Sequence, residues 1–154
     1  MGGLSVEEYL SESGLNVEIR KFEESTKSSE LAARALGCTI AEIAKSVVFV
    51  GNGTAVVIIS GDRKVDTLKL AKEAGEPMRI ATPAEVKERT GYPIGGVPPF
   101  PHRKGVLVYP DVSLERFREV WAAGGTPNAV FRVNSSDLLR RLGRGPFDLS
   151  TLQG

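Results

Sequence analysis

Two almost wholly apolar runs, residues 46–50 and 55–59, are joined by the segment Gly-Asn-Gly-Thr at residues 51–54. Glycine and asparagine adopt the backbone angles of tight hairpin turns, and β-branched residues favour extended strands, so the pattern predicts a β-hairpin. A strand that faces water on one side alternates apolar and polar residues, and these two runs do not alternate. We therefore expect both faces of the hairpin to be covered, at the centre of the fold.

The rest of the chain predicts short helices and single strands in mixed order. Ser5 with Glu8, and Thr82 with Glu85, form capping boxes that begin helices. Further helices are predicted over residues 30–36, 39–44, 67–74, 114–122 and 137–142, and further strands over 17–22, 78–81, 106–109 and 129–133. Strands and helices do not alternate as in a doubly wound sheet. We expect one α+β domain over residues 1–154, with a frayed tail at 144–154.

Composition restricts the chemistry. Of the 154 residues, 41% are hydrophobic and 25% charged, which is typical of a globular domain. The net charge of +1 provides no overall positive field, so any RNA contact must use a local patch. The single cysteine, Cys38, excludes an internal disulfide and a multi-cysteine zinc site, and we interpret it as a small packed residue. The single histidine, His102, excludes most histidine-based metal sites.

The N-terminal sequence has neither the charged region nor the long apolar core of a secretory signal. No apolar run approaches the ~20 residues that would span a bilayer. The sequence therefore predicts a cytoplasmic protein without a membrane partner.

The first candidate site is the segment 91–105, in which glycine and proline are dense. Neither a helix nor a central strand tolerates this composition, so a long, rigid loop is predicted. Gly95 and Gly96 would let a ligand approach the backbone closely, while the prolines hold the loop in place. The same segment could also be a rigid crossover without a ligand, and the pattern alone leaves both interpretations open.

The positions of individual side chains also allow both a functional and a purely structural interpretation. Lys45, predicted at the junction of the helix 39–44 and the strand 46–50, could hold a phosphate or an oxyanion at a cleft, or simply extend into water. His102 could serve as a base or a donor near pH 7, although an exposed loop histidine is the commoner case. Tyr92 and Phe100 could stack on a nucleobase or pack in the core.

Four segments together resemble the YbaK/prolyl-tRNA synthetase-associated domain family, which contains aminoacyl-tRNA editing deacylases. They are Ala-Lys-Ser-Val-Val-Phe at 44–49, the run from Val57 to Asp66 with Gly61-Asp62, Gly-Tyr-Pro-Ile-Gly-Gly-Val-Pro-Pro-Phe at 91–100, and Asn-Ser-Ser-Asp-Leu at 134–138. The resemblance extends over residues 15–142 in order and spacing. Many members carry glycine after the position of Phe100, whereas this chain has Pro101, which bears on how His102 is oriented.

The resemblance implies a twisted, barrel-like mixed β-sheet surrounded by short helices. It also implies a free-standing trans-editing enzyme that hydrolyses the ester between a wrong amino acid and the 3′-terminal adenosine of tRNA, with Ala- or Cys-tRNA(Pro) as typical substrates. Lys45 would contact the phosphate or ribose of the terminal nucleotide, and backbone groups of Gly95 and Gly96 would hold the ester and the attacking water. The substrate-binding residues would be Tyr92, Ile94, Val97, Pro98, Phe100, His102 and Asp137.

No metal or cofactor is implied. The expected partners are the acceptor end of a mischarged tRNA and an aminoacyl-tRNA synthetase, with no role for DNA. Two alternatives stay open at this point. The chain could be a non-catalytic tRNA- or synthetase-binding module of the same fold, or a hydrolase of small aminoacyl esters.

Overall fold

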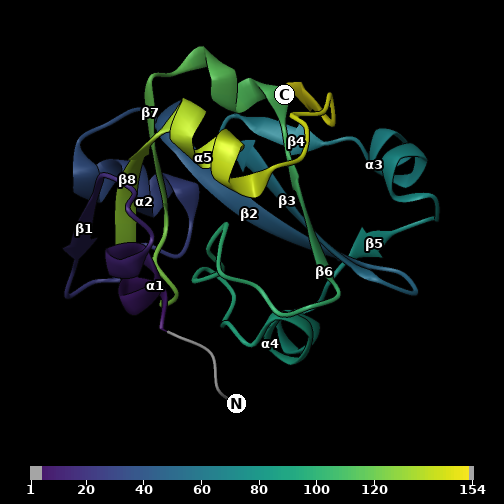
Figure 1. Ribbon diagram of the computed structural model, residues 1–154, viewed down its shortest axis with the longest axis horizontal. Coiled ribbons are helices and arrows are strands. Elements are labelled where there is room, and N and C mark those ends of the chain that lie inside the picture. Colours follow the sequence, from purple (N-terminus) through teal and green to yellow (C-terminus); the bar gives the residue numbers. More distant parts are fainter. Residues whose placement is uncertain (1–4, 153–154) are drawn as a thin grey trace.

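The predicted hairpin lies at the centre of the computed structural model, which describes residues 5–152 (Figure 1). Strands β2 (Ile43–Val50) and β3 (Thr54–Ser60) pair antiparallel, and every residue of β3 is buried. One face of the hairpin packs against helices α1 (Val6–Glu12), α4 (Pro83–Thr90) and α5 (Ser135–Leu142), and the other against α3 (Thr67–Ala74). The coverage of both faces that the sequence predicts is confirmed.

The hairpin belongs to a mixed sheet. Its strand order is β1 (Val17–Lys21), β8 (Ala129–Asn134), β7 (Glu119–Ala123), β2, β3 and β6 (Val106–Pro110), with the short strand β5 (Arg79–Ile80) paired to the end of β2. The pairs β2–β7 and β3–β6 are parallel, and the other pairs of this sheet are antiparallel. Strands β4 (Arg63–Val65) and β9 (Ser150–Leu152) form a second, two-stranded sheet. The α+β class and the mixed sheet with surrounding helices are confirmed.

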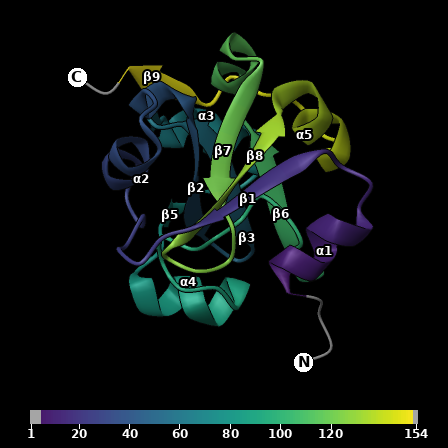
Figure 2. The same cartoon turned by 90° about the vertical axis from the view of Figure 1, so that its left-hand side faces the viewer.

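Helix α2 (Ser29–Leu36) covers the sheet where β2 meets β7 (Figure 2). Its residues Ala32 and Ala33 are buried against Ile43, the first residue of β2. The side chain of Ser28 accepts a hydrogen bond from the Leu31 N–H at 3.1 Å, and this cap fixes where the helix begins. The segment that leads into α2 is thereby held against the start of β2.

The predicted capping boxes are both present. The Ser5 hydroxyl accepts a hydrogen bond from the Glu8 N–H at 3.1 Å, and the Thr82 hydroxyl accepts one from the Glu85 N–H at 3.2 Å. In each case the glutamate carboxylate accepts from the backbone N–H of the capping residue. These two helix starts are therefore determined locally, as the sequence predicts.

The helix predicted over residues 114–122 is wrong. A short 3-10 helix, η2 (Val112–Arg116), is followed by the strand β7. Val120 and Ala122 are buried while Glu119 is exposed, which is the alternation of a strand. The backbone of β7 pairs with β8 on one side and with β2 on the other, and this pairing outweighs the helical spacing of the apolar residues.

The helix predicted over residues 39–44 is also shorter than expected. Only η1 (Ile40–Glu42) is helical, and β2 begins at Ile43. The cause is parallel pairing of Ile43 and Ala44 with Trp121 and Ala122 of β7. Lys45 is therefore the third residue of a strand, rather than a residue between a helix and a strand.

The tail predicted to fray from Arg144 is packed over the part that the structure describes, up to Leu152. Leu149 is completely buried, and β9 pairs with β4. The buried carboxylate of Asp111 accepts hydrogen bonds from the Leu149 N–H and the Ser150 hydroxyl, both at 2.8 Å. These long-range contacts hold the segment in place. Residues 153–154, like residues 1–4 of the predicted domain, lie outside the described residues.

Candidate functional site

A cavity of about 280 Å³ lies between the start of α2, the start of β2, the end of β7 and the loop that follows α4. We call it the α2–β7 cavity. It is lined by residues 26–30, 43–47, 94, 95, 97 and 121–123, together with Ala32 and Val130. Four of the residues predicted from the sequence are thus brought together in one place: Lys45, Ile94, Gly95 and Val97.

Lys45 on β2 contributes a cation to this cavity, and the exposed Lys27 is also among its lining residues. The Lys45 side chain is half-buried, and its ammonium nitrogen donates a hydrogen bond to the carbonyl oxygen of Gly61 at 3.4 Å. Burial lowers the pKa of Lys45, while the negative charges of Asp62 and Glu30 act in the opposite direction. Lys45 is therefore a partly desolvated cation, which interacts more strongly with an anionic ligand than a fully hydrated one would.

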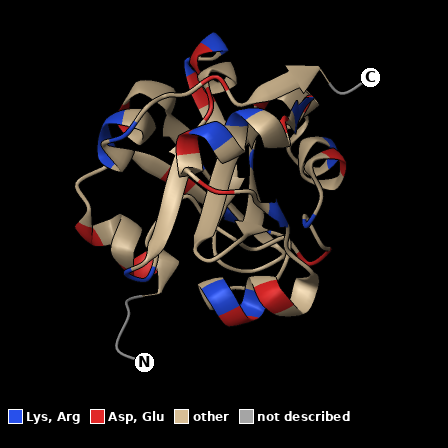
Figure 3. Cartoon of the chain, turned by 90° about the vertical axis from the view of Figure 1, so that its right-hand side faces the viewer, with Lys and Arg blue, Asp and Glu red and all other residues tan. Residues whose placement is uncertain are grey.

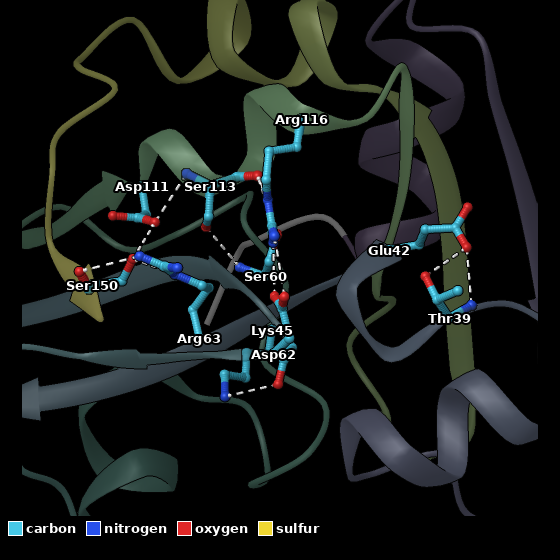
Figure 4. Close-up of polar contacts among 11 residues, drawn as sticks. Thr39, Glu42, Lys45, Ser60, Asp62, Arg63, Asp111, Ser113, Arg116 and Ser150 are labelled. Carbon is cyan, nitrogen blue, oxygen red and sulfur yellow. Dashed lines mark hydrogen bonds and ion pairs between the residues drawn. The ribbon is translucent and has the colours of Figure 1, made fainter. Parts of the chain in front are cut away.

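The turn that accepts the Lys45 hydrogen bond is itself held by charged groups. The Asp62 carboxylate forms a two-point ion pair with the Arg116 guanidinium, at 2.7 and 3.1 Å (Figure 4). This guanidinium lowers the pKa of Asp62 below its usual range. Arg116 also donates to the carbonyl oxygen of Ser113, whose hydroxyl accepts from the backbone N–H of Ser60. The turn is thus tied to η2 and to the end of β3.

The glycine loop forms a second wall of the cavity. The N–H of Gly96 donates to the carbonyl oxygen of Pro93 at 2.9 Å, and Gly95 has a positive φ of 83°, which fits the third position of a type II turn. A side chain on Gly95 would collide with Lys27, and one on Gly96 would come within 3.0 Å of the Thr126 backbone. Both glycines are therefore required by close packing of the loop.

The two glycines differ in what they offer a ligand. The Gly96 N–H is used within the turn, and Gly96 is buried outside the cavity lining. Gly95 lines the cavity, and neither its N–H nor its C=O has a hydrogen-bond partner within residues 5–152. Gly95 is consequently the glycine whose backbone groups are available there.

The other loop residues named from the sequence lie outside the lining of this cavity. Phe100 is 6% exposed and packs against the rings of Tyr9 and Phe131 in the core. The Tyr92 hydroxyl donates to the carbonyl oxygen of Pro101 at 2.7 Å, and Pro98 is buried. We interpret these contacts as support for the loop.

His102 is held between the same parts of the loop. Its Nε2 is 2.7 Å from the carbonyl oxygen of Pro98, so this nitrogen carries a proton, and its ring meets Tyr92 edge-on. Burial lowers the pKa of His102, and its Nδ1 is buried without a partner among the described residues. In this position a neutral imidazole links the end of the loop to Pro98 and Tyr92.

Asp137 lies at a different site, a shallow depression that it shares with Leu15, Arg140 and Arg141. Its carboxylate accepts a hydrogen bond from Arg140 at 3.3 Å, and its backbone N–H donates to the Asn134 side chain that caps α5. The structure therefore does not bring Asp137 together with Lys45 and Gly95.

Sequence reasoning missed two walls of the cavity. The segment before α2 contributes the hydroxyl groups of Thr26, Ser28 and Ser29, and β7 contributes Trp121 and its neighbours. From the sequence alone, Ser28 and Ser29 are interpretable only as helix caps, and Trp121 falls within the predicted helix 114–122. Their place in the site depends on the pairing of β7 with β2, which no local pattern reveals.

Ser46 lines the same cavity, and its hydroxyl is buried without a hydrogen-bond partner among residues 5–152. A buried hydroxyl that makes no hydrogen bond loses its water contacts without compensation, so a polar ligand group beside it would be favourable. Cys38 packs, partly buried, beside α2, and burial raises the pKa of its thiol, which does not favour a nucleophilic role.

Comparison with known proteins identifies the family to which this chain belongs. The family model described as an aminoacyl-tRNA editing domain matches residues 23–141, which include the whole lining of the α2–β7 cavity. The chain belongs to the aminoacyl-tRNA editing domain family. Within this family it is 39% identical to the uncharacterized protein YwhH of Bacillus subtilis, over 79% of this chain and 78% of that protein.

Two further members of this family or fold are similar over most of the chain. One is the multifunctional Ser/Thr-tRNA deacylase ProXp-y of Escherichia coli, 32% identical over 76% of this chain and 74% of that protein. The other is a crystal structure of a candidate trans-editing enzyme for prolyl-tRNA synthetase, 41% identical over 90% of this chain and 87% of that one, with a TM-score of 0.79. Relatives that act on aminoacyl-tRNA are thus named among the similar proteins.

Residues 5–152 contain no group of three or more His, Cys, Asp or Glu side chains that could hold a metal ion. Among the same residues, each helix is too short or too polar to cross a membrane.

Proposed function

We propose that this chain is a single-domain aminoacyl-tRNA deacylase that acts in trans on mischarged tRNA in the cytoplasm. The observation that carries the proposal is the α2–β7 cavity, in which the half-buried cation of Lys45 and the unpaired backbone groups of Gly95 line the same space. The family and the similarity to ProXp-y over most of both chains support an editing activity.

In the proposed mechanism, the protein positions an already activated ester. Lys45 binds the phosphate or ribose of the terminal nucleotide as a point charge, and its partial burial strengthens this contact. The Gly95 N–H faces the oxygen that becomes negative as water attacks the ester carbon, and the Gly95 C=O is available to orient that water. Gly96 serves by closing the turn, so the role expected for both glycines is reassigned to Gly95 alone.

The acyl group that this cavity accepts is small. A volume of about 280 Å³ must hold the ester and part of a ribose, and Ala44, Ala122 and Ala123 border it. This favours alanine, cysteine, serine or threonine esters over larger ones, because a larger side chain would be excluded by size. The unpartnered Ser46 hydroxyl would favour an acyl group that carries a hydroxyl or a thiol.

The test is amino-acid release from a panel of tRNA(Pro) charged with alanine, cysteine, serine, threonine or proline, with the methyl esters of the same amino acids as controls. The proposal predicts hydrolysis of at least one small-acyl tRNA, slow hydrolysis of Pro-tRNA(Pro), and little action on the methyl esters.

Two results would contradict this function. If the folded protein hydrolysed none of the aminoacyl-tRNAs, the alternative of a non-catalytic tRNA- or synthetase-binding module would be favoured. If it hydrolysed methyl esters as well as aminoacyl-tRNA, it would be a hydrolase of small aminoacyl esters.

A further inference from the structure

A second cavity adjoins the first one. It has a volume of about 570 Å³ and is lined by residues 45, 47 and 49 of β2, residues 64, 65 and 67, and residues 78–80. We call it the β2–β5 cavity. We propose that it binds the nucleotide that precedes the esterified terminal nucleoside, as a single-stranded RNA site. This inference rests on the proposed function, because the ester in the first cavity sets where the RNA strand begins.

The two cavities share Lys45 and Val47. A ribose whose ester lies in the α2–β7 cavity is joined through its 5′ phosphate to the preceding nucleotide. If that phosphate is bound by Lys45, at the boundary, the preceding nucleoside falls on the β2–β5 side. The shared lysine thus provides the direction of the strand as well as its anchor.

The β2–β5 cavity has an apolar floor suited to a nucleobase and a cationic rim suited to a phosphate. Its floor is apolar, with Val47 and the buried ring of Phe49 from β2 and the partly buried thioether of Met78. A nucleobase has two flat, weakly polar faces that pack on such side chains without regard to sequence. Lys64 and Arg79 stand at the rim with Lys45, and no acidic side chain is among the lining residues.

The rim cations differ in how far they are already neutralised. Arg79 forms a two-point ion pair with Glu85, at 2.7 and 2.8 Å, so part of its charge is balanced. Lys64 is exposed on β4 and makes no ion pair with any residue in the described range 5–152. Lys64 is therefore the residue most able to gain a phosphate contact. Figure 3 views the molecule from this side, with α3 and β5 toward the reader.

Charge favours RNA over an apolar peptide as the occupant. Ile80, at the edge of the cavity, is 64% exposed, and an apolar segment of another protein could also cover it. Such a segment would gain nothing from the three cations, and it would have to dehydrate them. A phosphodiester strand uses the cations and the apolar floor together.

Met78 allows a direct binding test. The chain has two methionines, Met1 and Met78, so the protein labelled with ¹³C at the methionine methyl groups gives two signals. The Met78→Leu variant identifies which signal belongs to Met78. We expect the 5′-phosphorylated dinucleotide cytidylyl-adenosine, which carries a second phosphate for Lys64, to shift the Met78 signal, and adenosine monophosphate to leave it in place. Lys64→Ala should weaken the dinucleotide titration.

Kinetics gives the second readout. For one amino acid, kcat/KM is measured on the full aminoacyl-tRNA and on the 3′-aminoacyl ester of adenosine alone. Lys64→Ala should lower the ratio of the two values about fivefold, the upper range for one exposed charge contact. The matched control is Lys72→Ala, which removes an exposed lysine of α3 that lines neither cavity.

The outcomes separate this proposal from the function on which it rests. If the wild type hydrolyses no aminoacyl ester, the proposed function fails. If hydrolysis is normal but the dinucleotide leaves the Met78 signal unchanged, and Lys64→Ala behaves as Lys72→Ala does, this RNA site is refuted. A Met78 shift caused by an apolar heptapeptide, and not by the dinucleotide, would likewise overturn it in favour of a protein groove.

Discussion

The ammonium nitrogen of Lys45 lies 3.4 Å from the carbonyl oxygen of Gly61, so the position of this cation depends on a turn at the far end of β3. That turn has little freedom to move. A side chain on Gly61 would collide with the carbonyl oxygen of Ile40 and come within 3.0 Å of Ser29, and the next residue, Asp62, is paired with Arg116. The position of the cation is therefore set by the packing of η1, α2 and η2 around the turn.

Replacing Asp62 with asparagine should lower the pKa of Lys45 and shift the alkaline limb of the pH profile of kcat/KM. The carboxylate of Asp62 raises the pKa of Lys45 against the lowering effect of burial, so its removal lowers that pKa further. We expect Asp62→Asn to lose activity at a lower pH than the wild type on the alkaline side, with kcat/KM at pH 7.5 reduced about threefold by the looser turn.

The measurement is a pH profile of kcat/KM between pH 7 and 10, corrected for spontaneous ester hydrolysis. Glu18→Gln, which removes an exposed carboxylate paired with Arg132 on β8, is the matched control. An alkaline limb that coincides with that of the wild type would contradict the coupling of Asp62 to Lys45.

Gly95→Ala should lower both stability and activity. Any residue with a side chain is strained at a positive φ, by about 1 kcal/mol, and at this position the new methyl group would also collide with Lys27. Gly75→Ala is the matched control, because Gly75 has φ 76° and open space around its Cβ position. Urea unfolding should show a larger loss of unfolding free energy for Gly95→Ala, and equal losses would mean that the Lys27 contact is not tight.

The pH dependence of stability should report on His102. Burial lowers the pKa of His102 in the folded protein, so between that pKa and its unfolded value near 6.5 the unfolded chain binds more protons. The contribution of His102 to stability is therefore present above about pH 6.5 and is lost as the pH falls through the folded pKa.

His102→Gln keeps a side-chain donor near the Pro98 carbonyl and removes the titration. The unfolding free energy of the wild type should fall more steeply than that of the variant between pH 7 and 5, as measured by urea unfolding at several pH values. Parallel curves would show that His102 titrates normally in the folded state.

Asp111→Asn should be strongly destabilising. The buried carboxylate accepts hydrogen bonds from the Ser113 N–H, the Leu149 N–H and the Ser150 hydroxyl, and an amide group would place a donor against one of these donors. A loss of about 3 kcal/mol in the unfolding free energy is expected. Asp148→Asn, which breaks an exposed pair with Lys69, should cost about 0.5 kcal/mol. Similar losses for the two variants would contradict the role of Asp111 as the anchor of the C-terminal segment.

The sequence predicts those parts of the fold that depend on local chemistry. The hairpin of β2 and β3 and the capping boxes at Ser5 and Thr82 follow from turn residues, apolar runs and side-chain oxygens within a few positions. Strand β7 and the packed tail do not follow, because each depends on distant partners. Ala122 pairs with Phe131 and Ala44, and Leu149 is held by Asp111.

The same distinction applies to the site. Lys45 and Gly95 could be named from the sequence because each stands in a short segment that resembles a known family. Ser28, Ser29 and Trp121 could not, because they reach the cavity only through the packing of α2 and the pairing of β7 with β2. Phe100 and His102 belong to the loop that contains Gly95, but their side chains do not line the cavity. They pack against Phe131 and contact the Pro98 carbonyl oxygen, respectively, and so support the loop.

The central claim is that Lys45 serves the hydrolysis of an aminoacyl-tRNA ester in the α2–β7 cavity. The most direct test follows amino-acid release from the best tRNA of the panel by the wild type, Lys45→Ala and Lys72→Ala, with folding of each protein verified by circular dichroism. The account predicts that Lys45→Ala lowers kcat/KM by at least about tenfold, the loss of one charged contact to the substrate, while Lys72→Ala behaves as the wild type. Equal kcat/KM values for Lys45→Ala and the wild type would contradict it.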